Sequence, residues 1–420
     1  MKYIKYFETE HERQSCSDTY KYMSYTVESQ LVNIHKEVPP FFCKLTLNND
    51  EVVEIEGSGE LTQSMVNSYK TTAVKIELGE LCNSVEMSLC MNWTSLTELK
   101  ISNAVKSIAD IAFLGTSLTE VILPNNNISI GNGTFANCTA LTTVSIPNSI
   151  TNISPSAFSG CTSLPVVDNI RYADTFLVEA VDKTLSTYTI KEGTRFIGYD
   201  AFMGCESLTN ITIPNSVIDI CSSAFMECPS LPVINSIRYA DTCAVMAVDL
   251  SLETYTLKEG TRFIGSCFNC CEQLTHITIP DTVISICDDA FSACPSLLNI
   301  TIPNSVIRVG NLAFEFCESL TNVTLSNNIT VIPVAMFGAC TSLTNITLPS
   351  NIKKIERDAF YDCSSLSAIT SLSTLAPSIA ADNPFDGINV NGILYVPQGS
   401  SGYDAWLTVL GEGWTMEYIS

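Results

Sequence analysis

The chain has 420 residues, of which 46% are apolar and only 15% are charged, and this composition indicates a large core and a heavily buried, β-rich protein. Acidic residues outnumber basic ones by 44 to 21, which gives a net charge of −23. A field of this sign repels phosphate backbones and anionic lipid, so we expect no nucleic-acid partner, and no apolar run approaches the roughly 20 residues of a membrane span.

Residues 1–70 are predicted to form a small α+β module that caps the chain or attaches it to another body. Residues 1–40 are rich in Tyr, Glu and Ser and lack the apolar segment of a standard signal peptide. Residues 44–55 are predicted to be a hairpin that turns at 48–50, and residues 60–69 a short helix. The protein is therefore expected either to reach its destination by another route or to act where it is made.

Residues 71–370 consist of copies of one frame, Cys-x-Ser-Leu-Thr-x-Ile-x-Ile-Pro-x-Ser-Val-x-x-Ile-Gly-x-x-Ala-Phe-x-x, about 23 residues long. Clear copies begin at Cys138, Cys205, Cys271, Cys294, Cys317 and Cys340, and two long copies begin at Cys161 and Cys228. The period lies within the range of leucine-rich repeats, about 20–29 residues. The prediction is a β-rich solenoid, a leucine-rich repeat array with parallel strands about 4.8 Å apart.

The pattern within one unit predicts a short strand with one buried face. Ile211 and Ile213 alternate with Asn210 and Thr212, and alternation of this kind is typical of a half-buried strand. Pro214 ends the pairing because proline has no N–H to donate to a ladder. Such a unit buries its apolar side only when it is stacked on its neighbours.

The two long copies carry nearly identical insertions at about 165–187 and 232–254. The alternation in residues 175–181 predicts that each insertion is a β-hairpin. One interpretation is a duplicated cassette that merely covers an edge. The other is a pair of protruding binding elements, anchored by Arg171, Tyr172, Arg238 and Tyr239, since Tyr and Arg are common interface anchors.

Residues 371–420 depart from the repeat and are predicted to cap the array. Residues 394–400 resemble a closing strand and turn, and Trp406 and Trp414 follow. A terminal coil exposes core and unpaired strand edges. We therefore interpret the two tryptophans as core of the cap rather than as a platform for a ligand.

Nine cysteines recur in the repeat frame, and they are predicted to be reduced, buried thiols that act as small apolar spacers. Neighbouring cysteines would lie about 5 Å apart in a straight row, which does not surround a tetrahedral metal. The Cys267, Cys270 and Cys271 cluster is interpreted in the same way, because no histidine nearby completes a zinc site. We expect neither a metal nor a cofactor.

Catalytic motifs are missing from the sequence. It has three histidines, at 11, 35 and 276, and it lacks a phosphate-binding loop, Gly-x-Ser-x-Gly and His-Glu-x-x-His. The expectation is that the protein is not an enzyme, and a hydrolase acting in the groove of the solenoid is the least favoured hypothesis.

The outward strand positions form the best candidate binding surface. Two stacked columns comprise Asn210, Thr212, His276, Thr278, Asn299, Thr301, Asn322, Thr324, Asn345 and Thr347. One interpretation is that Thr simply suits an exposed strand. The other is a ladder of hydroxyls and amides that binds a glycan or a protein, as solenoid faces do.

The recurring frame closely resembles that of the BspA-like (Treponema-type) leucine-rich repeat family, and the resemblance covers about residues 73–370. The closing LYVPQGSSGYDAW resembles the C-terminal cap of that family. The resemblance implies a parallel-stranded solenoid of surface proteins that mediate adhesion, for example to host matrix or cell-surface proteins, and it brings no catalytic residues.

We therefore expect a non-enzymatic binding protein at a cell, extracellular or virion surface. The alternative is an intracellular or structural scaffold that binds the producer's own proteins, because no signal peptide is visible.

Overall fold

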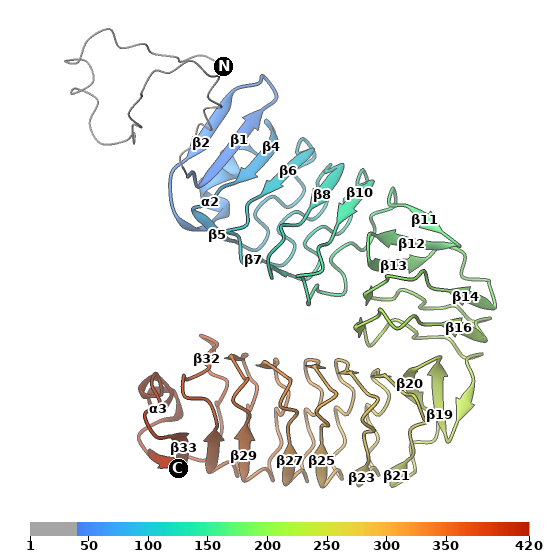
Figure 1. The fold of residues 1–420 in the computed structure, drawn as a ribbon, viewed down its shortest axis with the longest axis vertical. Coiled ribbons are helices and arrows are strands. Elements are labelled where there is room, and N and C mark those ends of the chain that lie inside the picture. Colours follow the sequence, from blue (N-terminus) through green and yellow to red (C-terminus); the bar gives the residue numbers. More distant parts are fainter. Residues whose placement is uncertain (1–39, 420) are drawn as a thin grey trace, which may run out of the picture. The chain divides into compact units, whose positions relative to one another are not determined.

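A computed structural model describes residues 40–419, so the predictions made for residues 1–39 lie outside the described residues. Residues 40–419 belong to one compact unit. It is a β-solenoid in which each coil contributes one strand to a front ladder and one strand to a back ladder (Figure 1). Where strands of neighbouring coils pair within a ladder, as β25 does with β27 and β24 with β26, they pair in parallel, which confirms the predicted fold class.

The front ladder carries the residues that the sequence analysis placed on the outer face. Its strands are β4 (Ala73–Leu78), β6 (Glu98–Ile101), β8 (Glu120–Ile122), β10 (Thr143–Ser145), β14 (Thr187–Thr189), β16 (Asn210–Thr212), β21 (Thr254–Tyr255), β23 (His276–Ile277), β25 (Asn299–Thr301), β27 (Asn322–Thr324), β29 (Asn345–Leu348), β31 (Ala368–Ser371) and β33 (Gly392–Pro397). In Figure 1 the strands from β21 to β29 lie side by side.

The back ladder is made of shorter strands, mostly of two residues. They are β5 (Cys82–Val85), β7 (Ser107–Ile108), β9 (Ser129–Ile130), β15 (Phe196–Ile197), β17 (Asp219–Ile220), β22 (Phe263–Ile264), β24 (Ser285–Ile286), β26 (Arg308–Val309), β28 (Val331–Ile332), β30 (Lys354–Ile355) and β32 (Ser378–Ile379).

The core between the two ladders contains a column of stacked phenylalanines, one from each coil. From Phe268 to Phe385 the ring centroids of successive coils lie 5.1 to 5.7 Å apart and the rings are nearly parallel. This separation is close to the distance between neighbouring strands, about 4.8 Å, so each ring continues the register of the ladder.

The N-terminal end is closed by the predicted hairpin, β1 (Cys43–Leu47) and β2 (Val52–Ile55). Strand β1 pairs antiparallel with β4, so this hairpin belongs to the same sheet as the first coils. The predicted helix over 60–69 is shorter than expected, because residues 59–61 form β3 (Gly59–Leu61), and α2 (Gln63–Val66) and a 3-10 helix (Asn67–Tyr69) follow.

The C-terminal end is closed by β33, α3 (Asp404–Leu410) and β34 (Trp414–Ile419), in which β33 and β34 pair in parallel. Trp406 is 1% exposed and Trp414 is 4% exposed. The indole N–H of Trp406 donates to the carbonyl of Pro377, 3.0 Å away. The tryptophans therefore lie in the core of the cap.

Each insertion is the predicted hairpin preceded by one further short strand. The first comprises β11 (Val166–Val167), β12 (Ile170–Ala173) and β13 (Phe176–Ala180), and the second comprises β18 (Val233–Ile234), β19 (Ile237–Ala240) and β20 (Cys243–Ala247). Strands β13 and β20 pair in parallel with β15 and β22. The insertions are thus built into the back ladder.

A proline starts each insertion. In ordinary coils the Thr at this position bonds to the preceding coil, as when the N–H of Thr209 donates to the carbonyl of Ser186 at 2.9 Å. Pro165 occupies this position in the first long copy and has no N–H to donate. The chain then turns back at Asp168 and Asn169, which both have positive φ, 50° and 63°, as a tight two-residue hairpin turn requires.

Candidate binding surface

The front strands bury their central residue and expose the residue on either side. Ile211, Ile300 and Ile346 are 2–3% exposed, and the residues that flank them in β16, β25 and β29 are exposed. All ten predicted front-face residues, from Asn210 to Thr347, are exposed in the structure.

The structure brings eight of these ten residues together in four successive coils. Asn299 is the register partner of Asn322, and Thr301 is that of Thr324. We refer to these eight residues as the Asn/Thr array: His276, Thr278, Asn299, Thr301, Asn322, Thr324, Asn345 and Thr347. Asn210 and Thr212 lie apart from the array, because β16 pairs with β14 and the second insertion separates it from β21.

In two of the three array asparagines, Asn322 and Asn345, the preceding threonine helps to orient the amide. The Nδ2 of Asn322 donates to the Oγ1 of Thr321 at 3.1 Å, and that hydroxyl donates to the carbonyl of Leu298 in the preceding coil, also at 3.1 Å. Asn345 makes the same 3.1 Å contact with Thr344. These contacts restrict the amide side chains before any partner arrives, which lowers the entropy lost on binding.

A hollow of about 380 Å³ lies at the end of the array where the front strands turn. Thr301, Thr324 and Thr347 line it together with Asn304 and Asn327. The two asparagines are not among the predicted site residues. A signal for them is present in the repeat, because an Asn recurs at the same position after the front strand at 215, 304 and 327.

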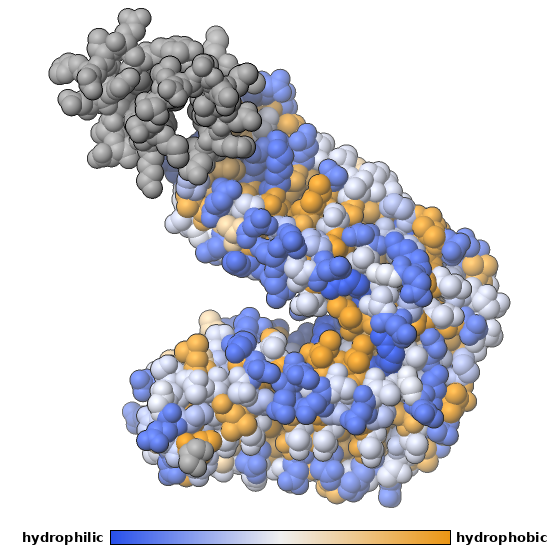
Figure 2. All heavy atoms as spheres, viewed as in Figure 1, coloured by the Kyte–Doolittle hydropathy of each residue, from blue (hydrophilic) through white to orange (hydrophobic). Residues whose placement is uncertain are grey.

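The walls of this hollow combine polar and apolar groups. Pro303, Pro349, Leu325 and Leu372 contribute carbon surface beside the threonine hydroxyls, and Leu372 is 43% exposed. On the face drawn in Figure 2, hydrophobic side chains likewise form small patches among polar ones. Mixed surfaces of this kind are usual in protein–protein interfaces that form reversibly.

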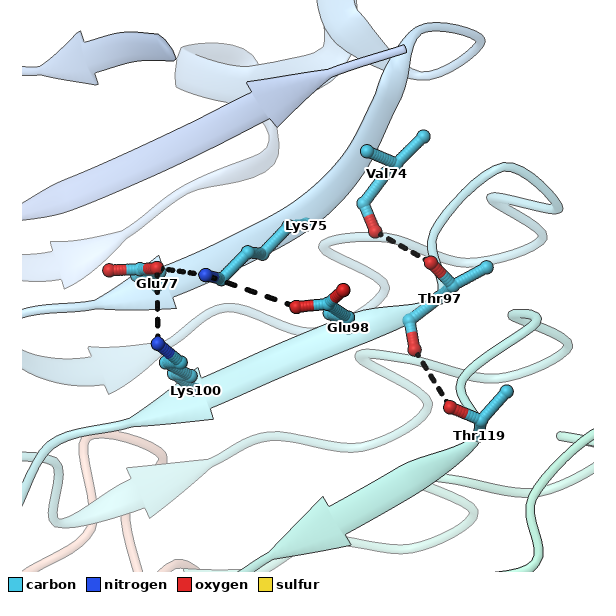
Figure 3. A network of polar contacts seen from close by, with 7 residues as sticks. All are labelled: Val74, Lys75, Glu77, Thr97, Glu98, Lys100 and Thr119. Carbon is cyan, nitrogen blue, oxygen red and sulfur yellow. Dashed lines mark hydrogen bonds and ion pairs between the residues drawn. The ribbon is translucent and has the colours of Figure 1, made fainter. Parts of the chain in front are cut away.

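The first front strands are charged, unlike the array, and their charges pair with one another. Lys75 binds Glu77, the Nζ of Lys75 lies 3.9 Å from the Oε2 of Glu98, and the Nζ of Lys100 lies 3.6 Å from the Oε1 of Glu77 (Figure 3). Burial opposes ionisation of Glu77, but Lys75 and Lys100 outweigh it and lower the pKa of this carboxyl. The charged surface of these first strands therefore differs from the face of the later coils, where the residues that flank the strand centres are uncharged in β25, β27 and β29.

The four anchors predicted in the insertions hold the insertions to the solenoid. Tyr172 and Tyr239 are 2% and 0% exposed, and their hydroxyls accept the main-chain N–H of Lys191 and Lys258 at 3.2 and 2.9 Å. This burial removes both rings from the surface.

Each insertion arginine donates to backbone carbonyls of its own long coil. The Nη1 of Arg171 donates to the carbonyl of Leu164 at 2.9 Å, and its Nε donates to Glu179, also at 2.9 Å. The Nη1 of Arg238 donates to the carbonyl of Leu231 at 2.9 Å.

The described part of the chain offers no group of three His, Cys, Asp or Glu side chains arranged to hold a metal ion. In the Cys267–Cys271 cluster, Cys267 and Cys271 are buried and Cys270 is exposed. Among residues 40–419, we also find no helix with the length and apolar character needed to cross a bilayer.

A sequence model of the BspA type leucine-rich repeat region matches residues 69–174, 181–265 and 261–379, which is most of the chain. The protein belongs to the BspA-type leucine-rich repeat family. Members of this BspA-type family are generally binding proteins without enzymatic activity. No curated protein matches the sequence.

Comparison with solved structures finds several chains that are similar to this BspA-type chain. A leucine-rich cell surface protein from Faecalibacterium prausnitzii is 20% identical, with 88% of each chain covered and a TM-score of 0.31. A leucine-rich repeat protein from Bacteroides ovatus is 22% identical, with 84% and 96% covered and a TM-score of 0.28. The pneumococcal vaccine antigen PcpA is 14% identical, with 90% and 88% covered and a TM-score of 0.32.

Proposed function

We propose that this BspA-type protein is a non-enzymatic binding protein, displayed on a cell, extracellular or virion surface, and that it recognises a protein partner through the Asn/Thr array. The observation that carries the proposal is the hollow lined by Thr301, Thr324 and Thr347, because it joins the array to apolar surface. A protein partner fits this mixture better than a glycan does, since it offers backbone groups for the hydroxyls and carbon surface for Pro303 and Leu372.

The array is tested by charge substitutions that leave the buried side of each strand intact. Asn322→Lys with Thr324→Lys places two ammonium groups beside the hollow, and both positions are exposed, so the fold should persist. Thr187→Lys with Thr189→Lys is the matched control, because these residues flank a buried residue in β14 outside the array.

Binding is measured against immobilised matrix proteins, such as fibronectin, and against a glycan array. The first variant should lose binding to a matrix protein while the control retains it. Equal binding by both variants overturns the role of the array, and binding to glycans alone overturns the protein partner.

Surface display is tested separately. An antibody against the solenoid should label intact producing cells or virions. Labelling that requires lysis of the cells, with no signal on virions, supports the intracellular scaffold instead.

A further inference from the structure

Within residues 40–419, hydrogen-bonded pairing along the front ladder stops between β6 and β8, between β23 and β25 and between β27 and β29, as well as at the two insertions. Only at the insertions does extra chain separate successive front strands, β10 from β14 and β16 from β21, and we call these two places the interruptions. Within residues 40–419, β10 pairs with β8 along one edge and with no strand along the other, and β16 pairs only with β14. The next front strand after β10 would fall 23 residues later, at residues 166–168. That segment is β11, which instead pairs antiparallel with β12.

Strand β10 directs the backbone groups of its central residue away from β8, its partner strand, and toward the interruption. Thr143 donates its N–H to Thr119 at 3.3 Å, and Ser145 accepts the N–H of Leu123 at 3.1 Å, so both residues face β8. Alternate residues of a parallel strand face opposite neighbours, so Val144 faces the interruption. In β16, the N–H of Asn210 donates to the carbonyl of Ser186 at 3.2 Å, and the carbonyl of Thr212 accepts the N–H of Ile190 at 3.3 Å. The backbone N–H and C=O of Ile211 therefore face the second interruption.

One backbone donor at each interruption is satisfied by a side chain instead of a strand. The Oδ2 of Asp174 accepts the N–H of Ile146 at 2.7 Å, and the Oδ2 of Asp241 accepts that of Ile213 at 2.8 Å. The carboxylate thus replaces the missing strand at the end of each edge and leaves the central residue, Val144 or Ile211, beside the opening.

A hollow of about 260 Å³ occupies the first interruption. Its walls are Thr143 and Val144 of β10 on one side and Pro165 and Val167 on the other, with Tyr172 beneath. Val167 is 42% exposed, so the wall opposite the free strand edge is apolar.

The second interruption repeats the residues that line the first, 67 positions later in the chain. Thr142, Pro165, Tyr172, Asp174 and Lys191 recur unchanged as Thr209, Pro232, Tyr239, Asp241 and Lys258, whereas Thr143, Val144 and Val167 become Asn210, Ile211 and Ile234. The contacts recur as well: the ammonium of Lys191 lies 4.3 Å from the centre of the Tyr172 ring, and that of Lys258 lies 4.7 Å from the Tyr239 ring.

We infer that the two interruptions are a pair of equivalent docking sites, each of which accepts an extended segment of a partner polypeptide that adds a strand to the free edge of β10 or β16. An edge strand accepts a peptide backbone through its unpaired N–H and C=O groups. The apolar wall at Val167 or Ile234 takes an apolar side chain of the segment. These sites are separate from the Asn/Thr array and do not depend on it.

The test uses a fluorescein-labelled peptide with the sequence of residues 207–216, SLTNITIPNS, because a segment of this kind lies along the free edge in an uninterrupted coil. Binding to the full chain is followed by anisotropy and by calorimetry. The expected stoichiometry is two peptides per chain. An analogue N-methylated at alternate residues should not bind, since it has lost the N–H groups that pair with the edge.

Val167→Glu should reduce the stoichiometry to one peptide, and Val167→Glu with Ile234→Glu should abolish binding. The matched control is Val166→Glu with Val233→Glu, which changes neighbouring residues that are 47% and 48% exposed and should leave both sites intact. Circular dichroism of each variant verifies that it has folded.

The inference is overturned if the unmethylated peptide does not bind at about 1 mM, if the double variant still binds two peptides, or if the control loses binding equally. Equal binding of the N-methylated analogue also overturns it, because the hollow would then take side chains without forming a strand pair.

Discussion

The thiol of Cys340 donates a hydrogen bond to the main-chain carbonyl of Phe314 in the preceding coil, with the Sγ 3.2 Å from the oxygen. The same contact, at 3.0 to 3.3 Å, links Cys138 to Phe113, Cys161 to Phe135, Cys228 to Phe202, Cys294 to Phe268, Cys317 to Phe291 and Cys363 to Phe337. Seven of the nine in-frame cysteines are therefore hydrogen-bond donors between coils as well as the apolar spacers that the sequence predicts; Cys205 and Cys271 instead lie 3.9 and 3.7 Å from the hydroxyls of Tyr188 and Tyr255.

Replacing Cys340 should measure what one such contact contributes. Cys340→Ala removes the donor and leaves a small cavity, so the free energy of unfolding should fall by about 1–2 kcal/mol. Urea denaturation followed by circular dichroism measures the change. Cys270→Ala is the control, because this thiol is exposed, and an equal loss in the two variants would contradict a role for the contact.

Thiol labelling should distinguish Cys270 from the buried cysteines. Burial raises the pKa of the Cys340 thiol well above its usual value, and a protonated, buried thiol reacts slowly. In a Cys16→Ser background, native protein at about pH 8 should label rapidly at one thiol, and the Cys16→Ser, Cys270→Ser variant at none. Labelling in urea should recover the remaining thiols, and rapid labelling of several thiols in the native state would contradict their burial.

The buried thiols should make stability fall at alkaline pH. Burial raises the pKa of Cys317 and of Cys363 from 9.0 to about 12, so between these values the unfolded chain releases protons that the native chain retains. The free energy of unfolding should therefore fall as pH rises from about 9 toward 12, by up to about 1.4 kcal/mol per pH unit for each thiol, with no such loss below about pH 8.

Denaturation in urea at a series of pH values measures this slope. Cys317→Ala with Cys363→Ala removes two of the titrating groups and should show a shallower decline than the parent chain. A slope that is unchanged in this variant would assign the decline to other groups.

The pair formed by Asp219 and Arg308 should stabilise the junction between distant coils. The guanidinium of Arg308 contacts the carboxylate of Asp219, which is 6% exposed and also lies 3.4 Å from the hydroxyl of Ser285. Asp219→Ala should lower the free energy of unfolding by about 3 kcal/mol, because a largely buried cation loses its partner. Asp219→Leu with Arg308→Met should lose less, and a greater loss in this double variant would contradict the ion-pair explanation.

Arg195 should contribute to thermal stability through the geometry of its guanidinium group and not through its charge alone. The guanidinium of Arg195 donates to the carbonyls of Pro147, Asn148 and Ile150 at 3.3, 3.3 and 2.6 Å, and it joins the first long coil to the coil before it. Arg195→Lys should lower the midpoint of thermal unfolding nearly as much as Arg195→Met, because a compact ammonium does not reproduce the planar fork. Full stability of Arg195→Lys would show that charge alone is sufficient.

The alternation within each repeat was sufficient to predict both faces of the front ladder. Ile300 lies between Asn299 and Thr301 in the sequence, and because strand side chains alternate, the burial of one fixes the exposure of the others. The hollow beside Thr301 was not predicted, since it depends on how Asn304 and Pro303 follow the strand into the turn. The burial of Tyr172 was also missed, because a local pattern does not reveal which surface an insertion packs against.

By itself, the sequence determined the solenoid, the buried or exposed side of the repeated front-strand residues and the positions of the two insertions, because a 23-residue period repeats the same local environment in every coil. The tertiary structure decided which residues meet across many coils. Asp219 and Arg308 are both outward residues of back strands in the repeat frame, and they become partners only through the coils and insertion that lie between them. Likewise, Pro165 marks in the sequence where the repeat is interrupted. Only the folded chain shows that the segment after Pro165 pairs elsewhere and leaves β10 with no strand partner on that side.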